Sequence, residues 1–182
     1  MPFIQTLTSI IVVAIENKRF ASELLEQEVQ KKEIQVAGEM QKLLFPLEFP
    51  KNKYIEVAAR YEPKHLVGGD YYDFIVLNES EYFFCIADVS GKGVAAALLM
   101  SNFQANLRAI IKYNYMKISL EDLIKNLNED VNNAAKGEKF ITFFAAHYNG
   151  KTKTLQYINA GHNYPILVDH QKTKLLNKGC IG

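Results

Sequence analysis

Apolar and polar positions divide the chain into a helical first part and a β-rich remainder. Up to about Leu44 the sequence is polar and charged, carries an apolar stripe, and has no proline after Pro2. The stripe has a heptad-like spacing that is interrupted and shifts in phase, and its positions are Leu7, Ile11, Ala14, Lys18, Ala21, Leu25, Glu28, Ile34, Ala37, Gln41 and Leu44. This pattern predicts helix, and its charged interruptions favour short paired helices over one long rod. Pro46 and Pro50 should end the helical region.

The role of this first segment has two alternatives that the residues leave open. An amphipathic helix could pack on its own domain, or it could act as a linker that pairs two subunits. A length of 182 residues suits one domain with an appendage. We therefore expect a helical linker or dimerisation segment over residues 1–45 and a single domain over residues 46–182.

Runs of aromatic and β-branched residues follow the prolines and are separated by two helical patterns. The runs predicted as strands are Tyr54 to Tyr61, Tyr71 to Leu77, Tyr82 to Ala87, Phe140 to Tyr148, Leu155 to Asn159 and Tyr164 to Val168. Apolar residues recur at helical spacing from Val94 to about Lys112, and again after Ser119, with Gly137 where a C-terminal cap is expected. Strands grouped around two consecutive helices predict an α+β fold with antiparallel sheet.

Composition and charge exclude several classes of function. Apolar residues make up 48% and charged residues 23% of the chain, a balance typical of soluble globular proteins. A net charge of +1 gives no electrostatic basis for nucleic-acid binding. The apolar run Ile10 to Ile15 is too short to span a membrane and is closed by Glu16. The two cysteines have no paired spacing, so we expect reduced thiols and a cytoplasmic protein.

Two aspartates beside glycines are the strongest chemical signal in the sequence. Asp70 follows Gly68 and Gly69, and Asp88 begins the run Asp88-Val89-Ser90-Gly91-Lys92-Gly93. Glycines let a loop turn tightly and approach a ligand closely, and carboxylate oxygens suit Mg²⁺ and Mn²⁺. The pattern therefore predicts a site for a hard divalent cation.

These segments resemble the bacterial SpoIIE/RsbU-type branch of the PP2C-like serine/threonine phosphatases. The resemblance continues through Gly91 to Met100 and through Asn159-Ala160-Gly161-His162-Asn163-Tyr164-Pro165, and it covers roughly Pro46 to the C-terminus. It implies a PP2C-like α-β-β-α sandwich, in which two antiparallel sheets pack face to face with helices outside. It also implies that the N-terminal helix links the phosphatase to an upstream sensor domain.

The resemblance further implies roles for individual residues. Asp70 and Asp88 would hold and bridge two Mn²⁺ or Mg²⁺ ions, with the backbone carbonyl of Val89 as a further ligand. A metal-activated water would then hydrolyse phosphoserine or phosphothreonine on a regulatory protein such as a STAS anti-anti-sigma factor. His162 lies in the resembled Asn-Ala-Gly-His turn, where it either makes a structural hydrogen bond or assists the leaving group. For Lys92 the residues themselves, rather than the resemblance, leave two alternatives: it attracts the substrate phosphate, or it is a solvated loop lysine. Asp73 is interpreted as structural.

One departure from the family pattern bears on catalysis. The family's later metal-binding aspartates come from a Thr-Asp-Gly segment and a further aspartate near the domain's end, and this chain contains no Asp-Gly dipeptide. We therefore expect the sandwich to be incomplete at the C-terminus, with an exposed sheet edge, in a piece of a longer phosphatase or a product that lost activity. The alternative function is a non-catalytic dimerising signalling module with an incomplete, weak metal site.

Overall fold

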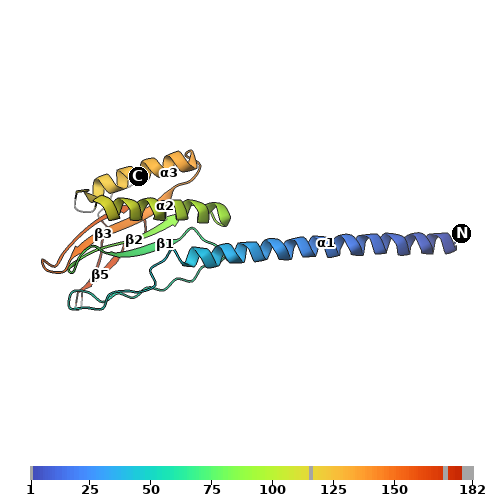
Figure 1. The fold of residues 1–182 in the computed structure, drawn as a ribbon, viewed down its shortest axis with the longest axis horizontal. Coiled ribbons are helices and arrows are strands. Elements are labelled where there is room, and N and C mark those ends of the chain that lie inside the picture. The colour runs from blue at the N-terminus through green and yellow to red at the C-terminus, as the bar shows by residue number, and fades with distance from the viewer. Residues whose placement is uncertain (1, 115–116, 170–171, 178–182) are drawn as a thin grey trace.

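The computed structural model describes residues 2–114, 117–169 and 172–177. Helix α1 projects as a rod from an α+β body (Figure 1). The elements are α1 (Pro2–Lys42), β1 (Tyr71–Val76), β2 (Glu81–Val89), α2 (Val94–Asn114), α3 (Leu120–Ala135), β3 (Ile141–Asn149), β4 (Thr154–Ala160), β5 (Ile166–Asp169) and β6 (Lys172–Leu175).

Helix α1 is one continuous helix of 41 residues, so the expectation of short paired helices is wrong. The charged interruptions of its stripe do not break it, because lysine and glutamate are good helix formers, and pairs such as Arg19–Glu23 support it at i,i+4 spacing. Residues 2–33 are exposed throughout. Packing begins near the other end, where Gly38 and Gln41 are buried. Of the two alternatives for this helix, packing on its own domain therefore applies to the last turns of α1.

Four strands form an antiparallel sheet in the order β1-β2-β3-β4. The β1–β2 connection turns at Asn78, whose Oδ1 accepts hydrogen bonds from the backbone N–H groups of Ser80 and Glu81, both at 3.0 Å. Strands β5 and β6 form a separate two-stranded sheet, with Asp169 opposite Lys172. Residues 170 and 171, between these two strands, lie outside the described residues. The predicted α+β class with antiparallel sheet is confirmed.

Helices α2 and α3 cover one face of the four-stranded sheet (Figure 1). Alternate residues of β2 point into this layer, where they meet the apolar side of α2; the buried set includes Phe83, Cys85, Ala87, Val89, Met100, Phe103 and Leu107. Ser119 caps α3, because its Oγ accepts a hydrogen bond from the backbone N–H of Asp122 at 3.0 Å. Helix α2 is long and apolar enough to cross a membrane by length and composition, but its buried residues belong to this core.

The opposite face of the sheet carries a row of aromatic rings. Phe74, Phe84, Phe144 and Tyr157 lie side by side across the four strands, with ring centroids 6.1, 6.5 and 5.8 Å apart in that order. Residues 50–70 contain no helix or strand, and one isolated bridge pairs Lys51 with Glu56.

The predicted strand from Tyr54 to Tyr61 is therefore wrong. Asn52 Oδ1 accepts hydrogen bonds from the N–H groups of Tyr54 (2.9 Å) and Ile55 (3.2 Å), so these donors do not enter a ladder. Tyr61, at the end of this run, packs instead against Phe45, with ring centroids 4.6 Å apart.

Candidate functional site

The register of the sheet brings Asp70 and Asp88 together. Tyr71 pairs with Ala87 in the antiparallel β1–β2 ladder, so the next position along places Asp70 opposite Asp88. The pKa of Asp70 is raised, chiefly because its carboxyl group is partly buried and also because the acidic side chain of Asp88 lies close to it. Two acidic groups thus lie side by side in a position that favours a cation between them.

Gly69 fits the Asp70 loop against the end of β2. A Cβ atom at this position would lie 3.0 Å from both the carbonyl oxygen and the Cβ of Val89, and 3.2 Å from the Cβ of Ala96. A larger residue would therefore push the loop away. This close approach places the Val89 carbonyl beside the residue that precedes Asp70, as a shared cation site would require.

The two carboxylates open into a hollow of about 620 Å³. Its lining also includes Arg60, Tyr61, His162 and Asn163. The sequence pattern did not identify Arg60 or Tyr61, because they belong to a run interpreted as a strand. The hydroxyl oxygen of Tyr61 is buried and has no hydrogen-bond partner among the described residues.

His162 is held in this hollow by two neighbours. Its Nδ1 lies 2.9 Å from Thr142 Oγ1, and Thr142 is the β3 residue paired with Asp88. The buried amide of Asn159 donates to the backbone oxygen of His162 at 2.9 Å and accepts from its N–H at 2.7 Å. Burial lowers the pKa of His162, and the charge of Asp88 opposes this shift. These contacts support the structural hydrogen bond, and help to a leaving group stays a prediction.

Lys92 does not line the hollow that contains the aspartates. It is exposed and borders a separate depression with Ile34, His65 and Leu66. Its contact with a substrate phosphate stays a prediction.

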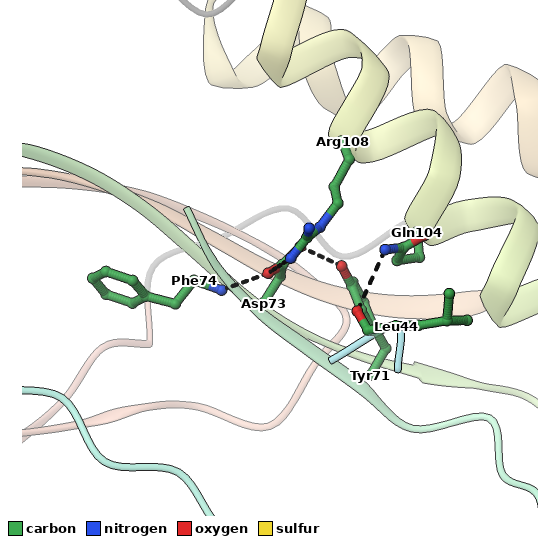
Figure 2. Close-up of polar contacts among 6 residues, drawn as sticks. All are labelled: Leu44, Tyr71, Asp73, Phe74, Gln104 and Arg108. Carbon is green, nitrogen blue, oxygen red and sulfur yellow. Dashed lines mark hydrogen bonds and ion pairs between the residues drawn. The ribbon is translucent and has the colours of Figure 1, made fainter. Parts of the chain in front are cut away.

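Asp73 has a structural environment, as expected (Figure 2). Its side chain is fully buried and accepts two hydrogen bonds from Arg108 of α2, from Nε at 2.7 Å and from Nη2 at 2.8 Å. The Tyr71 hydroxyl donates to the same carboxylate at 2.5 Å. The sequence did not indicate Arg108, because nothing in the spacing of α2 shows which residue faces β1.

The donor set at the aspartate pair consists of hard oxygens, which fits Mg²⁺ or Mn²⁺. Within the described part of the chain, no group of three or more His, Cys, Asp or Glu residues lies close enough to hold a metal ion. The residues that could hold a cation are thus Asp70, Asp88 and the Val89 carbonyl. This is a smaller set than two adjacent cations require.

Comparison with known sequences identifies the family. The sequence model of the Stage II sporulation protein E (SpoIIE) family matches residues 78–180, more than half of the chain. The chain belongs to the SpoIIE family. It is 34% identical over 138 residues to the phosphoserine phosphatase RsbU of Bacillus subtilis (strain 168), covering 76% of this chain and 40% of RsbU.

A second relative of this SpoIIE-family chain is the phosphoserine phosphatase RsbP of B. subtilis (strain 168). It is 23% identical over 149 residues, covering 80% of this chain and 36% of RsbP. The chain therefore spans two fifths or less of the length of these two relatives.

Solved structures show the PP2C fold. The SiaA-PP2C domain of Pseudomonas aeruginosa matches with a TM-score of 0.67 at 15% identity, over 84% of this chain and 61% of that one. The PP2C phosphatase domain of B. subtilis SpoIIE matches with a TM-score of 0.54 at 19% identity, over 62% and 32% of the respective chains. The PP2C-like fold expected from the sequence is confirmed.

Proposed function

We propose that this chain forms the larger part of a metal-dependent protein serine/threonine phosphatase domain. The observation that carries the proposal is the pairing of Asp70 with Asp88 across β1 and β2, where both carboxyl groups face one hollow. Membership of the SpoIIE family and the resemblance to RsbU and RsbP, both named phosphoserine phosphatases, support it.

In this proposal Asp70, Asp88 and the carbonyl of Val89 hold Mg²⁺ or Mn²⁺. A cation bound there would supply positive charge that neutralises a phosphate ester and would activate a water for hydrolysis. Two carboxylates that face one another benefit from a cation, which fits the raised pKa of Asp70.

The chain's own residues would shape the hollow around the phosphate. The ring of His162, fixed through Thr142, borders it beside Asp88 and would act as a neutral hydrogen-bonding group. Cys85 does not serve as a nucleophile, because it is buried in the helix-covered core and burial raises the pKa of its thiol. Hydrolysis by water, without a covalent enzyme intermediate, is consistent with this arrangement.

We further propose a phosphorylated STAS anti-anti-sigma protein as the substrate, in the cytoplasm. This assignment rests on the resemblance to RsbU and RsbP. An upstream sensor domain, joined through α1, would control the phosphatase in a longer protein.

The test is Mn²⁺-dependent release of phosphate from a phosphoserine protein or peptide by the longest polypeptide that the gene encodes. Turnover that requires Mn²⁺ or Mg²⁺ and is abolished in Asp88→Ala is the expected result. Glu129→Gln, an exposed change on α3, is the matched control and should keep full activity. A well-folded protein that stays inert on phosphopeptides and aryl phosphates, or an unchanged rate in Asp88→Ala, would overturn the proposal.

A second candidate is a non-catalytic dimerising module with a weak metal site. Two observations favour it: α1 exposes apolar side chains such as Leu7 and Leu25, and the described residues offer two carboxylates rather than a full set. In this case Leu25→Asp should convert a dimer to a monomer in analytical ultracentrifugation, and no turnover should be measured. A monomeric wild-type protein with measurable turnover would exclude it.

A further inference from the structure

One side chain of the projecting helix holds the loop that carries Asp70. Gln41 lies in the last turn of α1, and its Nε2 donates to the backbone oxygen of Gly68 at 2.8 Å. Its Oε1 accepts from the N–H of the same residue at 3.0 Å. A single amide thus satisfies both backbone groups of Gly68, two positions before Asp70. Gln41 is 8% exposed, whereas most of α1 is in solvent.

A glycine one turn earlier allows this contact. A Cβ atom at Gly38 would lie 2.1 Å from the backbone oxygen of Leu66, so a larger residue would have to push the helix and the loop apart. Positions 38 and 41 lie three residues apart and share one face of α1. This face therefore sets the distance between the helix and the loop.

The end of α1 is itself fixed to the core. Gln104 of α2 donates from Nε2 to the backbone oxygen of Leu44 at 3.4 Å (Figure 2). The next residue, Phe45, is buried and its ring centroid lies 5.9 Å from that of Tyr71, the residue that follows Asp70. The helix end and the first residues of β1 are thus packed together.

The loop is held from two sides. Gln41 binds the peptide groups of Gly68 on one side, and Gly69 rests against the Val89 carbonyl on the other. Asp70 lies directly beyond this clamped pair and faces Asp88. Because two acidic groups repel one another when both are ionised, their separation depends on how firmly the backbone holds each of them.

We propose that Gln41 is a positioning residue for the cation site, acting through Gly68 to fix the Asp70 carboxylate opposite Asp88. The inference rests on the proposed function, since it assumes that these carboxylates hold Mg²⁺ or Mn²⁺. Gln41 is not itself a metal ligand. It acts as an outer support that orients a ligand through the backbone.

The experiment titrates the full chain with Mn²⁺ alone and follows paramagnetic broadening of the Asp70 and Asp88 amide signals, which also reports weak binding. Gln41→Leu keeps the volume and removes both hydrogen bonds, whereas Gln41→Glu keeps the acceptor and removes the donor. Gln35→Leu is the control, because Gln35 is exposed on the same helix and contacts Glu39 of that helix.

We expect Gln41→Leu to weaken Mn²⁺ binding about 10- to 100-fold, Gln41→Glu to weaken it less, and the control to leave it unchanged. Amide hydrogen exchange of Gly68, measured without metal, should quicken in Gln41→Leu, because its N–H loses its acceptor. A purely structural role would lower the melting temperature without changing Mn²⁺ affinity.

Two outcomes separate the failure of this inference from that of the proposed function. Wild-type affinity in a folded Gln41→Leu chain would overturn the inference and leave the metal site standing. Absence of Mn²⁺ binding in the wild-type chain would overturn the proposed metal site and the inference with it.

If Gln41→Leu does not fold, Gly38→Ala provides the second variant. It should weaken Mn²⁺ binding by displacing the loop from α1, and wild-type affinity in Gly38→Ala would overturn the inference.

Discussion

The site holds two neighbouring acidic side chains and, close to them, a buried hydroxyl group. Asp70 and Asp88 lie opposite one another where β1 and β2 pair, and the pKa of Asp70 is raised by burial and by its neighbour. Close by, the hydroxyl of Tyr61 is buried without a partner among the described residues. Groups of this kind lower the stability of the folded chain and are characteristic of functional sites.

Removing the Asp88 carboxylate should stabilise the metal-free chain and, at the same time, weaken metal binding. In the metal-free chain we expect Asp88→Asn to raise the melting temperature slightly, by about 1 to 3 °C, because a like charge opposite Asp70 is removed. The same variant should lose the rise in melting temperature that Mn²⁺ gives to the wild type. Thermal unfolding with EDTA and with Mn²⁺ measures both effects. A variant that Mn²⁺ still stabilises as it does the wild type would contradict this prediction.

Removing the hydroxyl group of Tyr61 should affect the stability of the chain differently from removing that of Tyr71. Tyr61→Phe removes a hydroxyl that has no partner in the described part of the chain, so stability should stay equal or rise by up to about 1 kcal/mol. Tyr71→Phe removes a donor to the buried carboxylate of Asp73 and should cost about 1 to 3 kcal/mol. Urea unfolding of both variants provides the comparison. Equal losses in the two variants would show that the Tyr61 hydroxyl has a partner.

The contacts between elements explain how the site is built. The antiparallel pairing of β1 with β2 brings the aspartates together, and Arg108 attaches α2 to β1 through Asp73. The last turn of α1 holds the loop before β1 through Gln41. Three elements thus converge on the few residues around Asp70.

The Asp73–Arg108 pair should behave as a coupled unit. Arg108→Met leaves a fully buried carboxylate without its guanidinium, and because the arginine side chain is 45% exposed we expect a loss near the lower end of the usual range, about 3 kcal/mol. The double variant Asp73→Asn with Arg108→Met should lose less than the sum of the two single losses. Urea unfolding of the four proteins gives the coupling energy. Strict additivity would show that the two side chains do not stabilise one another.

Sequence patterns identified most of these elements but not their contacts. The strands of the four-stranded sheet correspond to runs of aromatic and β-branched residues. Asp70 directly follows Gly68 and Gly69, and Asp88 lies near the end of β2, before Gly91 and Gly93. The sequence pattern placed Gln41 on the helical stripe but did not indicate its partner. An amide at a heptad position gives the same pattern whether it faces a second helix or a loop. The run Tyr54 to Tyr61 was predicted as a strand, because its residue types favour strand pairing. The same residue types also favour side-chain packing, and in the structure Tyr61 packs on Phe45. Arg108 could not be found, since its partner depends on how α2 lies on β1.

At the scale of the whole molecule, the contrast between a packed body and an exposed helix requires a physical explanation. Residues 2–33 of α1 are exposed, including large apolar side chains such as Phe3, Ile11, Phe20 and Leu25. A helix of 41 residues is about 60 Å long, and most helical stability in proteins comes from packing of an apolar face. We therefore expect this helix to pair with that of a second copy.

Pairing of this kind should make stability depend on protein concentration. The melting temperature of the wild-type chain, followed by far-ultraviolet circular dichroism, should rise as concentration is increased about 100-fold, because association stabilises the folded state by mass action. Leu25→Asp places a charge on the exposed stripe and should remove this dependence, whereas Lys31→Gln, an exposed change on the same helix, should preserve it. A melting temperature that stays constant over this range would mean that α1 does not pair with a second copy in solution.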